Sequence, residues 1–300
     1  RPRGLRAEVI VEWVDHDGLV GGIVARLVGM RGRYGGFHKN AIDNATLGRT
    51  TMRLARLNAY LSRWVPRRIV SCSQAGITQH CAIGYAKGQF IVVPNGYDLG
   101  HFTPDLKRGR ALRSTLPVPD DVPLLGMVAR FHPQKDHLNL IKALGLLAKD
   151  GQDFRCLLIG TGISEKNGEL VRWLNAYNMR DRVFLLGQRN DIEVVMNALD
   201  IHILSSSNEA FPNVLCEAMA CTTPCVTTDV GDAALIVRNT GWVVPPKSPT
   251  ELANALLNAI QLRLADPEAW KRRRLQCRQH IADNFTIDKM VANYQRIWAT

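Results

Sequence analysis

The residues that first suggest chemistry are two glutamates, Glu209 and Glu217, with seven residues between them. Glu209 lies in a polar segment that follows an apolar run ending at Leu204, and Glu217 lies in a stretch with helical spacing of apolar residues. A loop carboxylate and a helix carboxylate at this separation can address different parts of one ligand. The two residues could equally make ordinary salt bridges at the surface, and the pair alone leaves both interpretations open.

The helix that carries Glu217 is expected to begin at Asn213, a residue type that favours the N-cap position. The backbone N–H groups of Asn213, Val214 and Leu215 would then be free. A helix N-terminus attracts anions because its N–H groups and its dipole both favour negative charge. We therefore expect residues 207–232 to form the site of an anionic ligand.

A basic pair lies earlier in the chain, within the segment GMVARFHPQKD at residues 126–136. The apolar run before it is typical of a buried strand, which would deliver Arg130 to its carboxyl end, with Lys135 near the start of the next helix. An arginine and a lysine that converge at such a place suit a diphosphate. A solvated basic pair is the alternative interpretation.

Two further loops follow predicted strands and contain glycine. Residues 160–162 read Gly-Thr-Gly and lack the third glycine of a dinucleotide-binding turn, so they are weak support on their own. The segment GQRND, which begins at Gly187, could bring backbone groups close to a nucleotide base.

The elements that must position these loops alternate along the whole chain, as in βαβ units of parallel sheets. They form two series, separated by a proline-containing stretch at residues 103–121. We therefore expect an α/β protein with two Rossmann-like lobes that face each other, with ligands at the carboxyl ends of the strands. A glycine-rich loop is expected at residues 32–44. Strands are expected at residues 7–13, 68–72, 90–93, 124–129, 154–159, 183–186, 201–204, 224–228 and 241–244, and helices at residues 18–28, 45–64, 73–85, 137–149, 168–177, 192–198, 213–220, 250–265 and 269–298.

Taken jointly, the segments VARFHPQKD, LIGTG, FLLGQRNDI and SNEAFPNVLCEAMACTTPCVTTDVG resemble the donor-binding lobe of glycosyltransferase family 4. That family has the GT-B fold and carries a Glu-x7-Glu signature, matched here by Glu209 and Glu217. The segments RIVSCS and VVPNGYD and the tail with Tyr294 and Trp298 also match. The resemblance covers essentially the whole chain and is most specific across residues 124–232. It implies the GT-B fold and sugar transfer with retention of configuration.

The resemblance also implies roles for single residues. Arg130 and Lys135 match the pair that holds the donor diphosphate and stabilises it as leaving group. Glu217 matches the carboxylate that binds the ribose hydroxyls, and Glu209 matches the one that faces the transferred sugar. Further substrate-binding residues implied in this way are Phe211, Asn213, Val214, Leu215, Gly160, Gly187, Arg189 and Asn190.

A histidine of the first lobe completes the expected catalytic set. His38, in the segment GGFHKN, resembles the histidine that faces the donor sugar across the cleft, and His16 is a weaker match. A solvated loop histidine is the alternative interpretation. We expect no metal, because two basic side chains and a helix dipole can stabilise the leaving phosphate without one.

The expected domains are a partial acceptor-side lobe at residues 1–117, a nucleotide-sugar lobe at residues 118–284, and a C-terminal helix at residues 285–300 that packs back toward the first lobe. The family's glycine-rich loop after its first strand has no counterpart here. The chain therefore resembles the family sequence from a point partway through the first lobe, with about 70 residues and part of the acceptor site missing.

The charge is placed unevenly. The net charge is +11, and residues 1–120 hold 18 Lys and Arg against 8 Asp and Glu, whereas residues 121–300 hold 20 against 19. A basic first part suggests an anionic partner such as a membrane surface or a phosphorylated acceptor, or else solubilising charge. Nucleic acid is disfavoured, because the arginines are not interleaved with aromatic residues. The predicted helix at residues 45–64 has a composition found in interfacial helices, although a lobe-packing helix with a basic outer face fits as well; its arginines are Arg49, Arg53, Arg56, Arg63, Arg67 and Arg68.

Other features narrow the class of protein. No run of about 18 apolar residues is present, and no signal peptide is visible. The seven cysteines form no Cys-x-x-Cys pair and are expected to be buried thiols of a cytoplasmic protein.

The resemblance therefore implies a metal-independent hexosyltransferase of the cytoplasm, with the inner face of the membrane as the place where a basic first lobe would dock. It would move a hexose from a UDP- or GDP-sugar to a glycan or lipid-linked acceptor, in the assembly of polysaccharide, lipopolysaccharide or glycolipid, and would need no cofactor. The alternatives are a nucleotide-sugar binding protein or epimerase of the same fold without transferase activity. Specificity for nucleotide, sugar and acceptor depends on loop shape, which these motifs do not encode.

Overall fold

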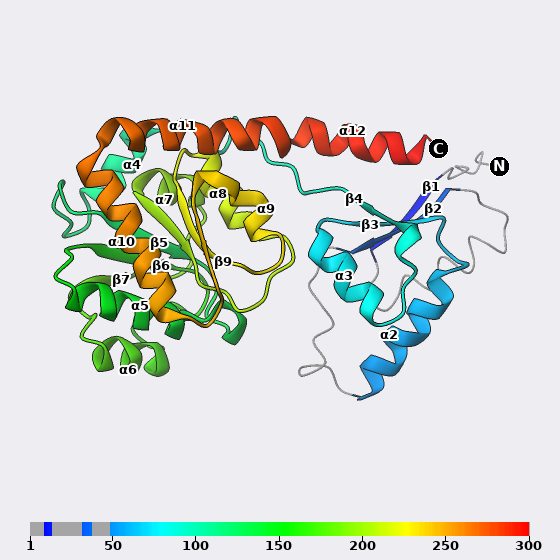
Figure 1. Ribbon diagram of the computed structural model, residues 1–300, viewed down its shortest axis with the longest axis horizontal. Helices are drawn as coiled ribbons and strands as arrows, with labels where there is room; N and C mark the ends of the chain where they lie inside the picture. Colours follow the sequence, from blue (N-terminus) through cyan, green and yellow to red (C-terminus); the bar gives the residue numbers. More distant parts are fainter. Residues whose placement is uncertain (1–8, 14–31, 38–48, 300) are drawn as a thin grey trace, which may run out of the picture. The chain divides into compact units, whose positions relative to one another are not determined.

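A computed structural model describes residues 9–13, 32–37 and 49–299 of the protein. The chain divides into two compact units (Figure 1). The first unit comprises Arg1–Gly96 and Asp288–Thr300, and the second is the continuous segment Tyr97–Ile287.

The first unit is built on a four-stranded parallel sheet with the strand order β1-β2-β3-β4. Its elements are β1 (Val9–Trp13), β2 (Gly32–Phe37), α2 (Arg49–Ser62), β3 (Arg68–Ser71), α3 (Gln74–Ala82), β4 (Phe90–Val92) and α12 (Ile287–Trp298).

The prediction of a loop at residues 32–44 was partly wrong, because the first six of these residues form β2. This strand lies between β1 and β3 and pairs with both in parallel. Glycine has a weak intrinsic preference for strands, but pairing on both sides satisfies the backbone N–H and C=O groups of a buried strand. The remainder, residues 38–44, lies outside the described residues, as does the helix predicted at residues 18–28.

The C-terminal helix α12 packs on the sheet of the first unit. The Tyr34 hydroxyl donates a hydrogen bond to the Ile297 carbonyl at 2.9 Å, and both residues are buried. Val70 and Val93 complete this small core, with Met290 and Tyr294 partly buried against it. Residues far apart in the sequence therefore share one core.

The second unit has a six-stranded parallel sheet with the strand order β10-β9-β8-β5-β6-β7 (Figure 1). Its strands are β5 (Leu124–Val128), β6 (Arg155–Ile159), β7 (Val183–Leu185), β8 (Ile201–Leu204), β9 (Cys225–Thr228) and β10 (Trp242–Val244). Its helices are α4 (Leu106–Arg113), α5 (His137–Lys149), α6 (Gly168–Ala176), α7 (Ile192–Ala198), α8 (Asn213–Ala220), α9 (Ala233–Val237), α10 (Pro249–Ala265) and α11 (Pro267–Asn284).

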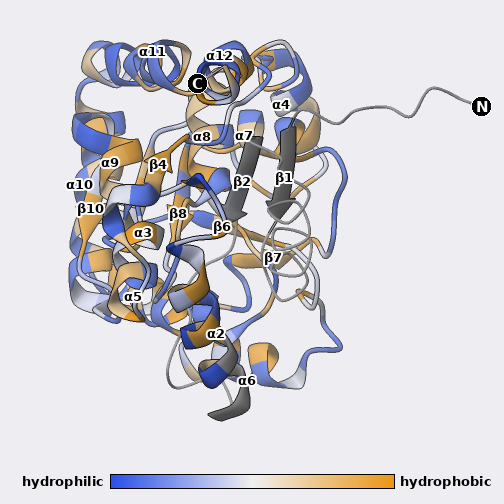
Figure 2. Cartoon of the chain, turned by 90° about the vertical axis from the view of Figure 1, so that its right-hand side faces the viewer, coloured by the Kyte–Doolittle hydropathy of each residue, from blue (hydrophilic) through white to orange (hydrophobic). Residues whose placement is uncertain are grey.

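The core of this unit lies between the sheet and helices α5 and α10. Leu140 and Leu144 of α5, Leu252 and Leu256 of α10, and the strand residue Ile203 are all fully buried in one cluster. Burying each such side chain contributes about 2 kcal/mol. Figure 2 shows the hydrophobic colour on β10, whereas much of α11 is hydrophilic. All seven cysteines are free, and six of them are buried.

Two features of the second unit differ from the sequence prediction. Residues 103–121, predicted as a connection, contain α4, which packs against α7. The division between the units accordingly falls between Gly96 and Tyr97 instead of near residue 117. The tail predicted as helical at residues 269–298 forms two helices, α11 and α12.

The break between α11 and α12 is held by hydrogen bonds. Tyr97 donates its backbone N–H to the Phe285 carbonyl at 2.9 Å and accepts the N–H of Ile287 at 3.2 Å. Phe285 is buried. The two points at which the chain passes between the units are thus bonded to each other.

Candidate functional site

The sheet of the second unit has a switch point between β5 and β8. From β5 the chain proceeds to β6 and β7 on one side of the sheet, and β8, β9 and β10 follow on the other. The loops after β5 and β8 therefore diverge at their carboxyl ends. In open parallel sheets this is the place where ligands bind.

An ion pair joins these two loops. Lys135, at the end of a short 3-10 helix (Pro133–Lys135), places its Nζ 2.5 Å from Oε1 of Glu209. The Ser206 hydroxyl donates to the same oxygen at 2.7 Å. The two charged side chains are 23% and 12% exposed, so they reach the surface yet are largely shielded from water. Lys135 and Glu209, which the sequence places on loops after neighbouring strands, are thus in direct contact.

Backbone contacts fix the loops that carry the pair. Ser207 donates its N–H to the Gln134 carbonyl at 2.8 Å, and the Ser205 hydroxyl donates to the Lys135 carbonyl at 3.0 Å. The Thr228 hydroxyl donates to the Ser206 carbonyl at 2.6 Å. A charged pair held by these hydrogen bonds needs little reorganisation to bind a ligand.

Gly231 holds the other side of the Glu209 loop. Its φ is +58°, and a Cβ there would lie 2.4 Å from the Ala210 carbonyl oxygen and 2.5 Å from that of Glu209. Asp232 donates its N–H to the same Ala210 carbonyl at 2.8 Å. Only glycine allows this approach, because any side chain would displace the backbone that carries Glu209.

Gly160 joins the neighbouring loops. Its φ is +146°, a Cβ would lie 2.2 Å from the Ala129 carbonyl oxygen, and its N–H donates to the Gly187 carbonyl at 2.8 Å. Phe131 donates its N–H to the Thr161 carbonyl at 2.8 Å. The predicted Gly-Thr-Gly turn therefore ties the loops after β5, β6 and β7 together.

The predicted basic residues differ in their availability. Arg130 is exposed, and its side chain makes no hydrogen bond or ion pair with any residue that the structure describes. Arg189 instead makes a two-point contact with Asp191, at 2.8 and 2.5 Å, which lowers the pKa of that carboxyl. Asn190 is exposed beside it. Arg130 can thus reach toward an anion, whereas Arg189 is already paired.

The start of α8 differs from the prediction in two respects. Pro212 occupies the N-cap position, and Asn213 is the first helical residue. The side chain of Asn213 accepts a hydrogen bond from the Tyr97 hydroxyl at 2.6 Å. The N–H of Leu215, predicted to be free, donates to the Pro212 carbonyl at 3.1 Å, because the first turn is tightened.

Further along α8, Glu217 is largely buried, and burial raises its pKa to about 7. A carboxyl with this pKa changes its protonation near neutral pH, which is often seen at functional sites. Phe211 is buried and packs edge-on against Phe285, at 5.7 Å between ring centres, so packing accounts for its position. Val214 is partly exposed.

Two contributors were missed by the sequence analysis. Ser206 bonds Glu209, and the run of three serines after a buried strand was the available signal. His137, the first residue of α5, is buried 5.4 Å from the Phe131 ring. Burial lowers its pKa to about 4, and the charge of Lys135 acts in the same direction, so the imidazole is neutral behind the loop.

The predictions about the two histidines of the first lobe concern residues that the structure does not describe, and the structure does not test the expectation that no metal is needed. His38 and His16 lie outside the described residues. Within the ranges 9–13, 32–37 and 49–299, no three His, Cys, Asp or Glu side chains cluster as metal ligands would. None of the helices in these ranges is long and apolar enough to cross a membrane.

Residues 110–276 match the family model of the glycosyl transferases group 1. The chain belongs to this family. The matched region contains both loops of the Lys135–Glu209 pair. Two α/β units, each with a parallel sheet, are the architecture of the GT-B glycosyltransferases. The solved structures below confirm the predicted fold class.

Curated group 1 relatives resemble the chain at low identity. The UDP-Gal:alpha-D-GlcNAc-diphosphoundecaprenol alpha-1,3-galactosyltransferase of Escherichia coli is 27% identical over 203 residues, which are 67% of this chain and 51% of that protein. The D-inositol 3-phosphate glycosyltransferase of Actinosynnema mirum is 33% identical over 55% of this chain and 42% of its own length. The chain spans about half the length of the curated relatives it matches.

Solved structures share the fold. A glycosyltransferase from Rickettsia africae superposes with a TM-score of 0.82 at 19% identity, over 97% of this chain and 76% of that one. Anabaena HepE, determined in complex with UDP, gives a TM-score of 0.80 at 23% identity, over 94% and 75%. At these identities the likeness concerns the fold alone.

Proposed function

We propose that this group 1 glycosyltransferase chain binds a nucleoside diphosphate sugar at the switch point and transfers its hexosyl group to an acceptor, with retention of configuration and without a metal. The observation that carries the proposal is the Lys135–Glu209 pair, a shielded cation and anion on adjacent loops. Such a pair offers a charge to the diphosphate and an acceptor to a sugar hydroxyl within one small volume.

The remaining groups fit the same ligand. Arg130 and Lys135 would share the diphosphate, which gains negative charge when the bond to the sugar breaks. Glu209 would face the sugar. Glu217 would accept hydrogen bonds from the ribose hydroxyls. These bonds would be favourable because the buried carboxyl has few water molecules to bond with when no ligand is present.

The galactosyltransferase relative of Escherichia coli is named for a diphosphoundecaprenol acceptor. We extend to this chain the coarser idea of a lipid-linked acceptor, in the assembly of cell-surface glycans such as lipopolysaccharide. The first unit supports it through charge, because residues 44–97 contain seven Lys and Arg and no Asp or Glu.

Calorimetric titration with UDP, GDP and their sugars tests the donor site. Lys135→Ala should weaken nucleotide binding about 10- to 100-fold, the range for a lost hydrogen bond to a charged group. Lys149→Ala, at the exposed far end of α5, should leave it unchanged. Equal binding by wild type and Lys135→Ala would contradict the proposal.

A turnover assay separates transfer from its alternatives. Release of nucleotide, with a product whose anomeric configuration matches the donor by NMR, supports retaining transfer. Conversion of the sugar without release of nucleotide identifies an epimerase. Binding without either reaction, in a longer chain supplied with acceptor, identifies a binding protein.

Helix α2 is the proposed contact with an anionic membrane at the inner face. Leu57, Tyr60 and Trp64 are each about half exposed, and the rings of Tyr60 and Trp64 meet edge-on at 4.9 Å. Exposed Arg53 and Arg56 lie on α2 with Leu57 and Tyr60, whereas Trp64 follows just after the helix ends; Figure 2 shows hydrophilic and hydrophobic residues interspersed along α2. Aromatic rings at the interface beside arginines near anionic headgroups are a recurrent membrane-binding arrangement.

Flotation with vesicles tests this contact. The protein should float with phosphatidylcholine vesicles that contain phosphatidylglycerol, not with phosphatidylcholine alone, and high salt should release it. Trp64→Ala and Arg56→Glu should each weaken binding about tenfold. The controls Leu275→Ala and Arg172→Glu change equally exposed residues of the second unit. If the control substitutions reduced flotation as much as Trp64→Ala and Arg56→Glu do, the assignment of the membrane contact to α2 would be overturned.

A further inference from the structure

A cavity lies in the second unit, away from the carboxyl ends of the strands that carry the Lys135–Glu209 pair. It has a volume of about 670 Å³, which is ordinary for a small-molecule site. Asp120 and Asp200 line it, and these residues lie just before β5 and β8 in the chain. The cavity is therefore at the amino edge of the parallel sheet, opposite to the Lys135–Glu209 pair.

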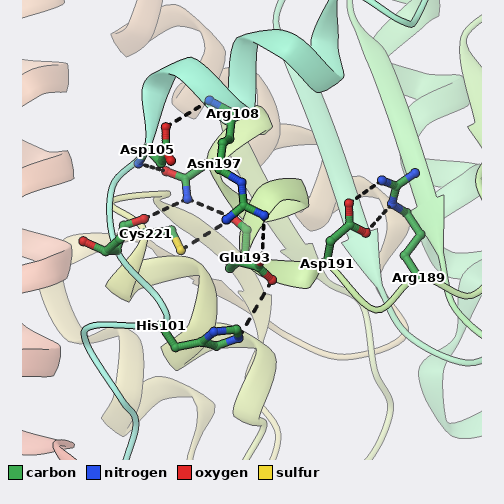
Figure 3. Close-up of polar contacts among 9 residues, drawn as sticks. His101, Asp105, Arg108, Arg189, Asp191, Glu193, Asn197 and Cys221 are labelled. Carbon is green, nitrogen blue, oxygen red and sulfur yellow. Dashed lines mark hydrogen bonds and ion pairs between the residues drawn. The ribbon is translucent and has the colours of Figure 1, made fainter.

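One wall is α4, which is locked onto α7 (Figure 3). The Asn197 side chain accepts the N–H of Asp105 at 2.7 Å and donates to the Thr103 carbonyl at 2.9 Å. Arg108 donates to Glu193 at 3.0 Å. Figure 3 shows these side chains converging between the two helices.

Gly109 allows α4 to approach α7 closely. A Cβ at Gly109 would lie 2.4 Å from the Asn197 carbonyl oxygen, so the backbones of α4 and α7 are in direct contact. The next residues of α4, Arg110 and Arg113, line the cavity. Their positions follow from the locked helix.

The lining carries more positive than negative charge, with four arginines and two aspartates. Asp200 is fully engaged: it accepts Arg113 at 2.9 Å, Arg263 at 2.9 Å and the N–H of Leu124 at 2.8 Å. Its single charge is thus shared between two guanidinium groups. A net positive charge remains on this wall.

The other two arginines lack an ionic partner among the residues described. Arg274 donates to the carbonyl and hydroxyl oxygens of Thr222, at 3.0 and 3.1 Å, and these acceptors are neutral. Burial lowers the pKa of Arg274, and the nearby Arg263 lowers it further, whereas Asp200 opposes both. Arg110 is exposed and makes no ion pair with the described part of the chain.

We propose that this cavity binds a small phosphorylated anion, at a site separate from that of the donor. Guanidinium groups from α4, α10 and α11 surround it, and a phosphate presents several oxygens that can engage different guanidinium groups together. A carboxylate offers only two oxygens in one plane. A diphosphate is small enough for the volume and supplies the missing negative charge.

Calorimetric titration with inorganic pyrophosphate at constant ionic strength tests the site. The full chain is titrated with the Lys135→Ala substitution in place, which weakens the donor site so that its contribution to the titration is small. Arg110→Glu should weaken pyrophosphate binding at least about tenfold. Asp120→Asn removes a negative charge from the same cavity and should strengthen it several-fold.

Arg172→Glu is the matched control, because Arg172 is an exposed helical arginine of α6 outside the cavity. It should leave the affinity unchanged. No binding of pyrophosphate, or an equal loss in Arg110→Glu and Arg172→Glu, would overturn the proposal. UDP binding by the chain with Lys135 restored reports on the donor site independently, and Arg110→Glu should leave that affinity intact.

Discussion

At the scale of single residues, the structure changes what the two glutamates mean. Glu209 is held by Lys135 and Ser206, whereas Glu217 lies in a helix with little access to water. Burial raises the pKa of Glu217 to about 7, whereas Glu209 is held in an ion pair. In the proposed donor site, these different environments would suit the two carboxylates to separate parts of the ligand.

The raised pKa of Glu217 predicts a dependence of stability on pH. The value rises from 4.5 to about 7, so the folded protein binds this proton more tightly than the unfolded chain. This contribution is complete below about pH 4.5 and is lost as the pH rises through about 7. Relative to Glu217→Gln, the wild type should lose roughly 3 kcal/mol of unfolding free energy across this window.

Urea unfolding at several pH values measures this difference. Glu165→Gln, which alters an exposed ion pair, should shift the unfolding free energy little at any pH. A constant difference between wild type and Glu217→Gln from about pH 4.5 to about pH 8 would contradict the assignment.

Residue types and spacing predicted much of the candidate site. Arg130, Lys135 and Glu209 were expected at neighbouring strand ends, and Lys135 and Glu209 do meet. The pairing of Arg189 with Asp191 was not foreseen, because two residues in a loop face each other only in particular backbone conformations. The hydrogen bond from the Leu215 N–H to Pro212 forms because the first turn of α8 is tightened, and residue types alone do not reveal such a tightened turn.

At the scale of elements, the Glu209 loop depends on Gly231. Gly231→Ala should lower the unfolding free energy by about 2–3 kcal/mol and weaken nucleotide binding, because a Cβ collides with the backbone of residues 209–210. Gly151→Ala is matched, since Gly151 has a φ of +77° but open space around it. It should cost about 1 kcal/mol through backbone strain alone.

Thermal unfolding and UDP titration of both variants distinguish collision from strain. If Gly231→Ala loses no more stability than Gly151→Ala and binds UDP normally, the loop does not depend on this close approach.

The elements that were mispredicted share a cause. β2 contains glycines that favour a loop locally, yet strands on both sides pair with it. α4 is short, strongly basic and contains Gly109, so its sequence gives a weak helical signal, and its fit against α7 provides the stability. In both cases contacts distant in sequence outweigh local preference.

At the scale of the whole molecule, alternation of strands and helices was sufficient to predict an α/β protein with two parallel sheets. The boundary was placed too late, because prolines suggested a linker where α4 already belongs to the second unit. The uneven charge is likewise visible without coordinates, but only the structure shows that Leu57, Tyr60 and Trp64 are exposed beside the arginines of α2.

The hydrogen bonds of Tyr97 with Phe285 and Ile287 have a mechanical consequence. The chain crosses between the units twice, and the two crossings are clasped into one short parallel bridge. Because of these hydrogen bonds the two crossing segments move together, whereas two segments without such bonds would move independently. A pulling force on one crossing is therefore resisted by the hydrogen bonds that join it to the other.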